Sequence, residues 1–129
     1  MLAAKGARVI LACRNMTACE VAAKSCGNEG IPKLVDFAKL SSVDALATRV
    51  LQEFERLDIL VLNAGVVLQP FSLTSDGVES VFAVNHVSQQ FLFRQLRPLL
   101  VKTAMAFGNV SVVSVSSASH FDSYSEGML

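Results

Sequence analysis

The chain has 129 residues, enough for one domain with a hydrophobic core. The charges of its 11 basic and 11 acidic residues cancel, so the composition gives no sign of a positively charged surface that would bind nucleic acid or an anionic membrane. Hydrophobic residues make up 52% of the chain and charged residues 17%, a balance that suits sheet strands covered on both faces.

The sequence shows few targeting or redox signals. Cys13, Cys19 and Cys26 match neither a zinc pair nor a Cys-x-x-Cys redox site, so we expect reduced thiols and no metal site. No signal peptide follows Met1, and the interrupted apolar run from Ile59 to Leu68 is shorter than the ~20 residues that span a bilayer. We expect a cytoplasmic or cytosol-facing protein without a transmembrane segment.

The first half of the chain is predicted to alternate strands and helices. The predicted elements are a helical turn over Leu2 to Lys5 that Gly6 ends, a strand over Val9 to Cys13, a helix from a Thr17 cap to about Ser25, a weaker strand over Lys33 to Phe37, a helix from a Ser41 cap to Leu57 and a strand over Ile59 to Leu62. The continuous apolar run of the last strand predicts that it is fully buried. Alternation at this pace predicts an α/β fold with parallel βαβ units and right-handed crossovers.

The second half is predicted to add one long helix and one strand. Its elements are a loop with Pro70 and the Asp76-Gly77 turn, a helix from Val78 to Arg97 with a kink or boundary at Pro98, a strand over Asn109 to Val115 and a polar loop from Phe121 to Leu129. Asn85 stands within an apolar helical face, where a short amide is usually avoided. Either Asn85 is simply exposed, or its amide or the nearby backbone serves a site.

Polar residues follow each of the predicted strands. They are Arg14-Asn15, Asp36, Asn63-Ala64-Gly65 and Ser116-Ser117. Strand ends that share one edge of a parallel sheet line a common crevice, where open α/β sheets bind ligands. For Asn63-Ala64-Gly65 alone, an ordinary turn explains the pattern as well as a ligand site does, but the clusters together favour a site.

These residues give the chain a resemblance to the classical short-chain dehydrogenase/reductase family, a Rossmann-type group. The matching segments are Ala7 to Asn15, Asp36-Phe37, Leu62 to Gly65, Asp76-Gly77, Val84 to His86 and Val115 to Ser117. The segments Ala12 to Asn15, Val84 to His86 and Ser116 to His120 are most similar to the retinol dehydrogenase and WW-domain-containing oxidoreductase branch.

The resemblance implies a nicotinamide cofactor and a small-molecule alcohol or carbonyl substrate. Its cofactor-binding positions are Arg14, Asn15, Asp36, Phe37, Asn63, Ala64 and Gly65. Asp36 would hydrogen-bond the adenine, and the turn Asn63 to Gly65 would pack along the adenosine side. As catalytic residues, Asn85 would hold a water in a proton relay and Ser117 would polarise the substrate carbonyl.

The residues after the first strand of this chain bear on the choice of cofactor. NAD-preferring members place an acidic residue where this chain has Cys13 and then Arg14. A carboxylate there would bond the ribose 2′-hydroxyl and repel a 2′-phosphate, whereas a guanidinium pairs with phosphate. We therefore expect NADP rather than NAD. A Rossmann methyltransferase, a third possible class, would also want an acidic residue there, so Arg14 argues against it.

Two motifs of the family are not found. There is no Thr-Gly-x-x-x-Gly-x-Gly turn, and the only tyrosine, Tyr124, is followed four positions later by Met128 rather than lysine. The resemblance therefore implies a single partial NAD(P)-binding Rossmann domain over residues 1–129, doubly wound, without the first, central strand and the C-terminal strands. The missing strand would lie between those ending at Cys13 and Leu62. We expect this chain to bind cofactor poorly and to be inactive alone.

A second hypothesis comes from another class of protein. The chain would be a non-catalytic binding or regulatory protein that pairs with a full-length relative through the Val78 to Arg97 helix, as a homo- or hetero-oligomer.

Overall fold

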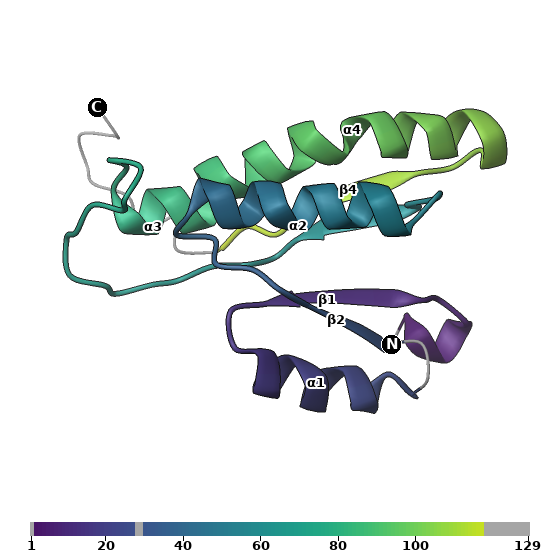
Figure 1. Ribbon diagram of the computed structural model, residues 1–129, viewed down its shortest axis with the longest axis horizontal. Helices are drawn as coiled ribbons and strands as arrows, with labels where there is room; N and C mark the ends of the chain where they lie inside the picture. Colours follow the sequence, from purple (N-terminus) through teal and green to yellow (C-terminus); the bar gives the residue numbers. More distant parts are fainter. Residues whose placement is uncertain (1, 28–29, 118–129) are drawn as a thin grey trace.

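The structure is a computed structural model that describes residues 2–27 and 30–117. Within these ranges strands and helices alternate, and the strands all run in the same direction (Figure 1). In chain order the elements are the 3-10 turn η1 (Ala3–Lys5), β1 (Val9–Cys13), α1 (Met16–Ser25), β2 (Gly30–Leu34), α2 (Leu40–Glu53), β3 (Ile59–Leu62), α3 (Ser80–Phe82), the π-helical turn η3 (Ala83–Val87), α4 (Ser88–Phe107) and β4 (Ser111–Ser114).

The strands form two separate parallel pairs rather than one continuous sheet. β1 pairs with β2, with Val9 opposite Gly30, and β3 pairs with β4, with Ile59 opposite Ser111. Between β1 and β3 lies a groove of about 820 Å³ that residues of both strands line. The parallel pairs confirm the predicted α/β class, and their separation agrees with the predicted lack of a central strand.

The helices lie on opposite sides of the strands. α1 packs on the β1–β2 pair, while α2 and α4 lie side by side on the other side, over β3 and β4 (Figure 1). Among the described residues, no helix is both long and apolar enough to cross a membrane.

Most of the core is built by α2, β3 and α4. In α2 the apolar residues recur at helical spacing, and this face is buried together with leucines of α4. The residues that contribute are Val43, Leu46, Ala47 and Val50 of α2 and Leu92, Leu96, Leu99 and Leu100 of α4. β3 contributes Leu60 and Leu62, but its Ile59 and Val61 are 43% and 47% exposed. The prediction of a fully buried strand was therefore wrong, because no described helix covers the second face of β3.

Helix starts were predicted less well than helix faces. The side chain of Asn15, not Thr17, caps α1, because Asn15 Oδ1 accepts a hydrogen bond of 3.0 Å from the N–H of Ala18. α2 begins at Leu40, before the predicted Ser41 cap, and the Leu40 N–H donates to Asp76 Oδ2 at 3.0 Å. A distant carboxylate thus replaces the local capping box that Ser41 suggested. α2 also ends at Glu53, short of the predicted Leu57.

The second strand lies earlier than predicted. β2 spans Gly30–Leu34, not Lys33 to Phe37. Pro32 is tolerated within it because the ladder bonds to β1 come from its neighbours. The chain leaves the strand at Asp36, whose Oδ1 accepts from the N–H of Ala38 in a tight turn.

The long helix also differs from its prediction at both ends. It begins with α3 at Ser80, where Glu79 caps the first turn, and it passes Pro98 to end at Phe107. Pro98 removes one helical hydrogen bond, yet the helix continues because leucines on both sides of it stay buried against α2 and β3. β4 is shorter than the predicted Asn109 to Val115 strand. The predicted loop from Phe121 to Leu129 lies outside the described residues.

Candidate functional site

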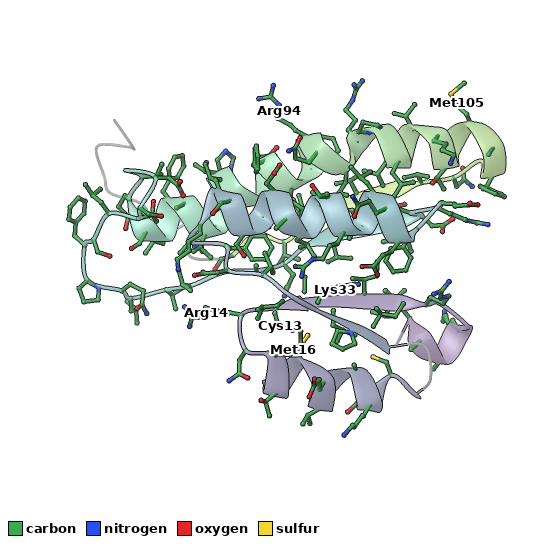
Figure 2. The ribbon with its side chains drawn as sticks, in the orientation of Figure 1. Cys13, Arg14, Met16, Lys33, Arg94 and Met105 are labelled. Atoms are coloured by element: carbon green, nitrogen blue, oxygen red, sulfur yellow. The ribbon has the colours of Figure 1, made fainter. Side chains whose placement is uncertain are left out.

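The carboxyl ends of the strands lie at one side of the molecule, as parallel strands require (Figure 1). Phe37, Asn63 and Ala64 line the same groove there, together with Ala12 of β1. Arg14 follows β1 at this side, with Cys13 and Met16 near it (Figure 2). The structure thus brings residues from three strand ends to one edge, as the sequence predicted.

The turn after β3 is held by side chains of the long helix. Asn85 Oδ1 accepts from the N–H of Val66 at 2.8 Å, and Asn85 Nδ2 donates to the Val66 carbonyl at 2.9 Å. Gly65 lies against the same amide, since a Cβ built on it would be 3.6 Å from Asn85 Oδ1. Gln89 Nε2 donates to the Ala64 carbonyl. Asn85 and Gln89 therefore hold the backbone on both sides of Gly65, at Val66 and at Ala64.

Asn85 lies within the π-helical turn Ala83–Val87, a helix distortion that is often found at functional sites. Asn85 is exposed, but the oxygen and the nitrogen of its side-chain amide are both hydrogen-bonded to the backbone of Val66. Both alternatives raised by the sequence thus hold in part: Asn85 is exposed, and its amide serves the turn. Its role in a proton relay stays a prediction.

The turn after β2 is held just as firmly. Ser42 Oγ accepts from the Asp36 N–H at 2.9 Å, and Ser88 Oγ donates to the Phe37 carbonyl at 2.6 Å. One carboxylate oxygen of Asp36 is used by Ala38, while Oδ2 lies 3.9 Å from Lys39 Nζ. The Asp36 carboxylate is half-buried and keeps acceptor capacity for a ligand.

Arg14 and Asn15 differ in whether their side chains are already used within the protein. Arg14 is exposed and forms no ion pair with a carboxylate in the described part of the chain. Asn15 is also exposed, but its side-chain oxygen caps α1. Of this pair, Arg14 has the group that is available to an anion.

Two titratable groups near these elements have shifted pKa values. Burial, followed by the hydrogen bond and charge of the Cys19 thiol, raises the pKa of Cys13 to about 11, so Cys13 stays a neutral thiol at the end of β1. The Glu79 carboxylate accepts hydrogen bonds from the N–H groups of Val81 and Phe82, and these bonds lower the pKa of Glu79.

Ser116 and Ser117 follow β4, and Ser117 is exposed. The structure thus places the predicted catalytic serine just beyond a strand end, as expected. His120 and Tyr124 lie outside the described residues.

Sequence reasoning gave no role to Ser88 and Gln89, which are 1% and 6% exposed. Both hold site backbone, Ser88 at Phe37 and Gln89 at Ala64. The signal that could have found them is a pair of polar residues within an apolar helical face, because buried polar groups are hydrogen-bonded.

The residues present fit one half of a dinucleotide. The free guanidinium of Arg14 suits a phosphate, the Asp36 carboxylate suits an adenine amino group, and the turn Asn63 to Gly65 offers close backbone approach. No glycine-rich turn in the sequence is available for a pyrophosphate. These residues therefore fit the adenosine side of the dinucleotide, and the sequence offers no site for its pyrophosphate.

A fold of parallel strand pairs with helices on both sides, and with polar residues at the strand ends, defines a Rossmann-type domain. The sequence model of the short chain dehydrogenase family matches residues 1–128. The chain belongs to this family, and it is retinol dehydrogenase-like.

The curated relatives include human retinol dehydrogenase 13, 39% identical over 124 residues, which cover 92% of this chain and 36% of that protein. Mouse retinol dehydrogenase 12 is 37% identical, and the match covers 92% of this chain and 38% of that protein. This chain therefore spans little more than a third of the length of these relatives.

Solved structures show the same likeness. A 3-ketoacyl-(acyl-carrier-protein) reductase from Brucella melitensis, complexed with NADH, has a TM-score of 0.73 and 27% identity over 90% of this chain and 49% of that chain. A metagenomic short-chain oxidoreductase in complex with NADP has a TM-score of 0.75 and 25% identity over 98% of this chain and 58% of that chain. The partial Rossmann fold is therefore confirmed.

Proposed function

We propose that this chain is an incomplete short-chain dehydrogenase domain that keeps the adenosine side of an NADP site and has no turnover of its own. The observation that carries the cofactor proposal is the exposed Arg14, unpaired with any carboxylate in the described residues, at the same molecular edge as the fixed turn Asn63 to Gly65. NADP would supply the hydride chemistry of the family when bound.

Each residue has a separate task in this proposal. Arg14 pairs with the 2′-phosphate, with Asn15 beside it at the start of α1. Asp36 hydrogen-bonds the adenine, with Phe37 as a further cofactor-binding residue, and the turn Asn63 to Gly65 packs along the adenosine side. Asn85 fixes that turn through Val66 and holds a relay water, while Ser117 polarises a substrate carbonyl. Because the sequence has no Tyr-x-x-x-Lys, no residue completes proton transfer, and the chain is inactive alone.

Cofactor binding is tested by titrating the 129-residue chain with NADPH and, in parallel, with NADH, following the fluorescence of the reduced nicotinamide. Arg14→Ala is expected to weaken NADPH binding by about tenfold, because a charge-assisted pair is lost, and to leave NADH binding within about twofold. Arg94→Ala is the matched control, since Arg94 is exposed on α4 and points away from the strand ends (Figure 2). An Arg14→Ala variant that binds both cofactors as the wild type does would contradict the NADP proposal.

Inactivity is tested with NADPH and a panel of retinoid, steroid and simple carbonyl substrates. We expect no NADPH oxidation above a protein-free control. Protein-dependent oxidation would overturn the second half of the proposal while leaving the binding result intact.

A non-catalytic role as a binding partner is the second candidate. It is favoured by apolar side chains on the long helix that remain exposed, namely Phe82 at 55%, Val101 at 44% and Met105 at 85%. Size exclusion and co-purification with an intact retinol dehydrogenase test it, with Met105→Glu as the variant expected to weaken the complex. A chain that captures no relative counts against it.

We also propose a cytoplasmic or cytosol-facing location, supported by the three cysteines, which are all free thiols.

A further inference from the structure

We propose that Cys13 and Cys19 are a reversible oxidation site, at which a low-molecular-weight disulfide such as oxidised glutathione converts the two thiols into one cross-link between β1 and α1. The cross-link would hold α1 against β1 and enclose Arg14 and Asn15 in a short covalent loop. This proposal does not depend on cofactor binding.

The first support comes from the face of β1 on which Cys13 lies. Side chains alternate between the two faces of a strand, so Leu11 and Cys13 share one face and Ile10 lies on the other. Ile10 packs against the core that α2, β3 and α4 build. The Cys13 side chain therefore points to the opposite layer, where α1 packs on the β1–β2 pair (Figure 1).

α1 brings Cys19 to the same layer. Asn15 caps this helix, and the Cys19 N–H donates to the Asn15 carbonyl at 3.0 Å, so Cys19 lies one helical turn beyond the cap. Cys19 is 0% exposed, and its Sγ donates to the Leu11 carbonyl at 3.0 Å. The Cys19 thiol is thus held against β1, close to the residue that shares a strand face with Cys13.

The two thiols meet in this layer. The side chains of Cys13 and Cys19 are hydrogen-bonded to each other. A disulfide forms when a thiolate attacks a sulfur that is already part of a disulfide, so the two protein sulfur atoms have to approach each other directly. The contact between the thiols provides this approach without a rearrangement of the strand or the helix.

The third thiol is out of reach of Cys19 in the folded chain. Cys26 is the residue at the far end of α1, and at 1.5 Å per residue its Cα lies about 10 Å from that of Cys19. A disulfide usually joins Cα atoms that are about 4.4–6.8 Å apart. Cys26 is half-buried, as Cys13 is, and therefore serves as an internal control for reactivity.

The reaction begins at Cys13, because Cys13 is half-buried whereas Cys19 is fully buried. Cys13 gives its proton to the solvent, and its thiolate attacks one sulfur of the small disulfide and releases one small thiolate. Cys19 then loses its proton, and its thiolate attacks Cys13 Sγ and expels the second small thiolate. Two protein thiols are thus oxidised to one S–S bond, while the S–S bond of the oxidant is reduced to two thiols that take up the two protons.

The environment of Cys13 makes this exchange slow. Burial, followed by the hydrogen bond and charge of the Cys19 thiol, raises the pKa of Cys13 to about 11, so little thiolate is present at neutral pH. The dithiol form prevails where small thiols are in excess, and the cross-link accumulates where the ratio of small disulfide to small thiol rises.

The test incubates the reduced 129-residue chain with oxidised glutathione, blocks the remaining thiols with N-ethylmaleimide and maps the products by mass spectrometry after digestion with trypsin. Trypsin cleaves after Arg8, Arg14 and Lys24, so the three cysteines lie on separate peptides, 9–14, 15–24 and 25–33. A Cys13–Cys19 disulfide joins the first two peptides. We expect this product to exceed the one that joins peptides 15–24 and 25–33 by about tenfold or more.

The same reaction in concentrated urea is the matched reference. In the unfolded chain the loops closed by Cys13–Cys19 and by Cys19–Cys26 differ by one residue, so the two products should form within about twofold of each other. A ratio in the folded chain equal to the ratio in urea would overturn the proposal, because the fold would then not select the pair. A glutathione that stays on Cys13 without conversion, or no oxidation of Cys13, would overturn it as well.

Two variants and one exchange measurement complete the test. Cys26→Ser should form the cross-link within about twofold of the wild-type yield, whereas Cys19→Ala should retain one glutathione on Cys13. In the oxidised wild type the Ala18 amide should exchange several-fold more slowly than in the reduced chain, while the Leu57 amide should not change. Equal exchange of the Ala18 amide in both forms would contradict the proposed restraint of α1 against β1.

Discussion

The two strand pairs are stabilised to different degrees, although each consists of two short parallel strands. The β3–β4 pair lies under α2 and α4, whose leucines and valines on the inner faces are almost completely buried. The β1–β2 pair packs on α1, whose buried residues are the small Cys19 and Ala23. Because stabilisation scales with the apolar area removed from water, the α2–β3–α4 half contributes most of the stability of the described domain.

The residues proposed to bind the cofactor are divided between these two halves. Arg14 and Asn15 lie on the thinner β1–α1–β2 half, whereas Asn63 to Gly65 is fixed to the stable half by Asn85 and Gln89. Segments with few buried apolar contacts open at a lower free energy than the core. A ligand that bridges both halves would therefore stabilise β1–α1–β2 most.

The largest effect is expected in the core of the stable half. Leu96, 3% exposed on α4, packs with the leucines of β3 and the apolar face of α2. Leu96→Ala should lower the free energy of unfolding by about 2–5 kcal/mol, measured by urea denaturation, because it leaves a cavity. Leu51→Ala is the control, since Leu51 is 43% exposed on α2, and we expect a change within about 0.5 kcal/mol. Equal losses in the two variants would show that the core does not lie where the structure places it.

A smaller effect is expected where α4 holds the amino end of β3. Thr103 is 1% exposed, and its Oγ1 accepts from the Leu57 N–H at 2.9 Å. Thr103→Val keeps the side-chain shape but leaves that N–H without its acceptor, so the free energy of unfolding should fall by about 1–3 kcal/mol. Hydrogen exchange of the Leu57 amide should accelerate. Thr48→Val on the exposed side of α2 makes the same chemical change and should alter neither measurement.

The sequence predicted the features that depend on local pattern. The bounds of β1 and β3 agree with their continuous apolar runs, and the apolar face of α2 agrees with its helical spacing. Topology then placed the polar residues after these strands at one edge. Parallel strands require that outcome, whatever the side chains do.

The features that were missed depend on partners far away in the chain. The start of α2 is set by Asp76, and the buried Ser88 and Gln89 are satisfied by carbonyls of loops that precede them by many residues. No local pattern specifies such partners. Likewise, Pro98 fails to end the long helix because burial of the surrounding leucines outweighs one lost hydrogen bond.

The smallest effect tests the thinner half and also separates the predicted cap from the observed one. Asn15→Ala removes the acceptor of the Ala18 N–H and should lower the free energy of opening of β1–α1–β2 by about 1 kcal/mol. Thr17→Ala should change it by no more than a few tenths of a kcal/mol, because Thr17 lies within the first turn and caps nothing there. Hydrogen exchange distinguishes the halves: the Ala18 amide should exchange faster in Asn15→Ala while the Leu57 amide keeps its protection. If Asn15→Ala exposed both amides equally, the halves would unfold as one unit, and their contrast in packing would have no counterpart in local stability.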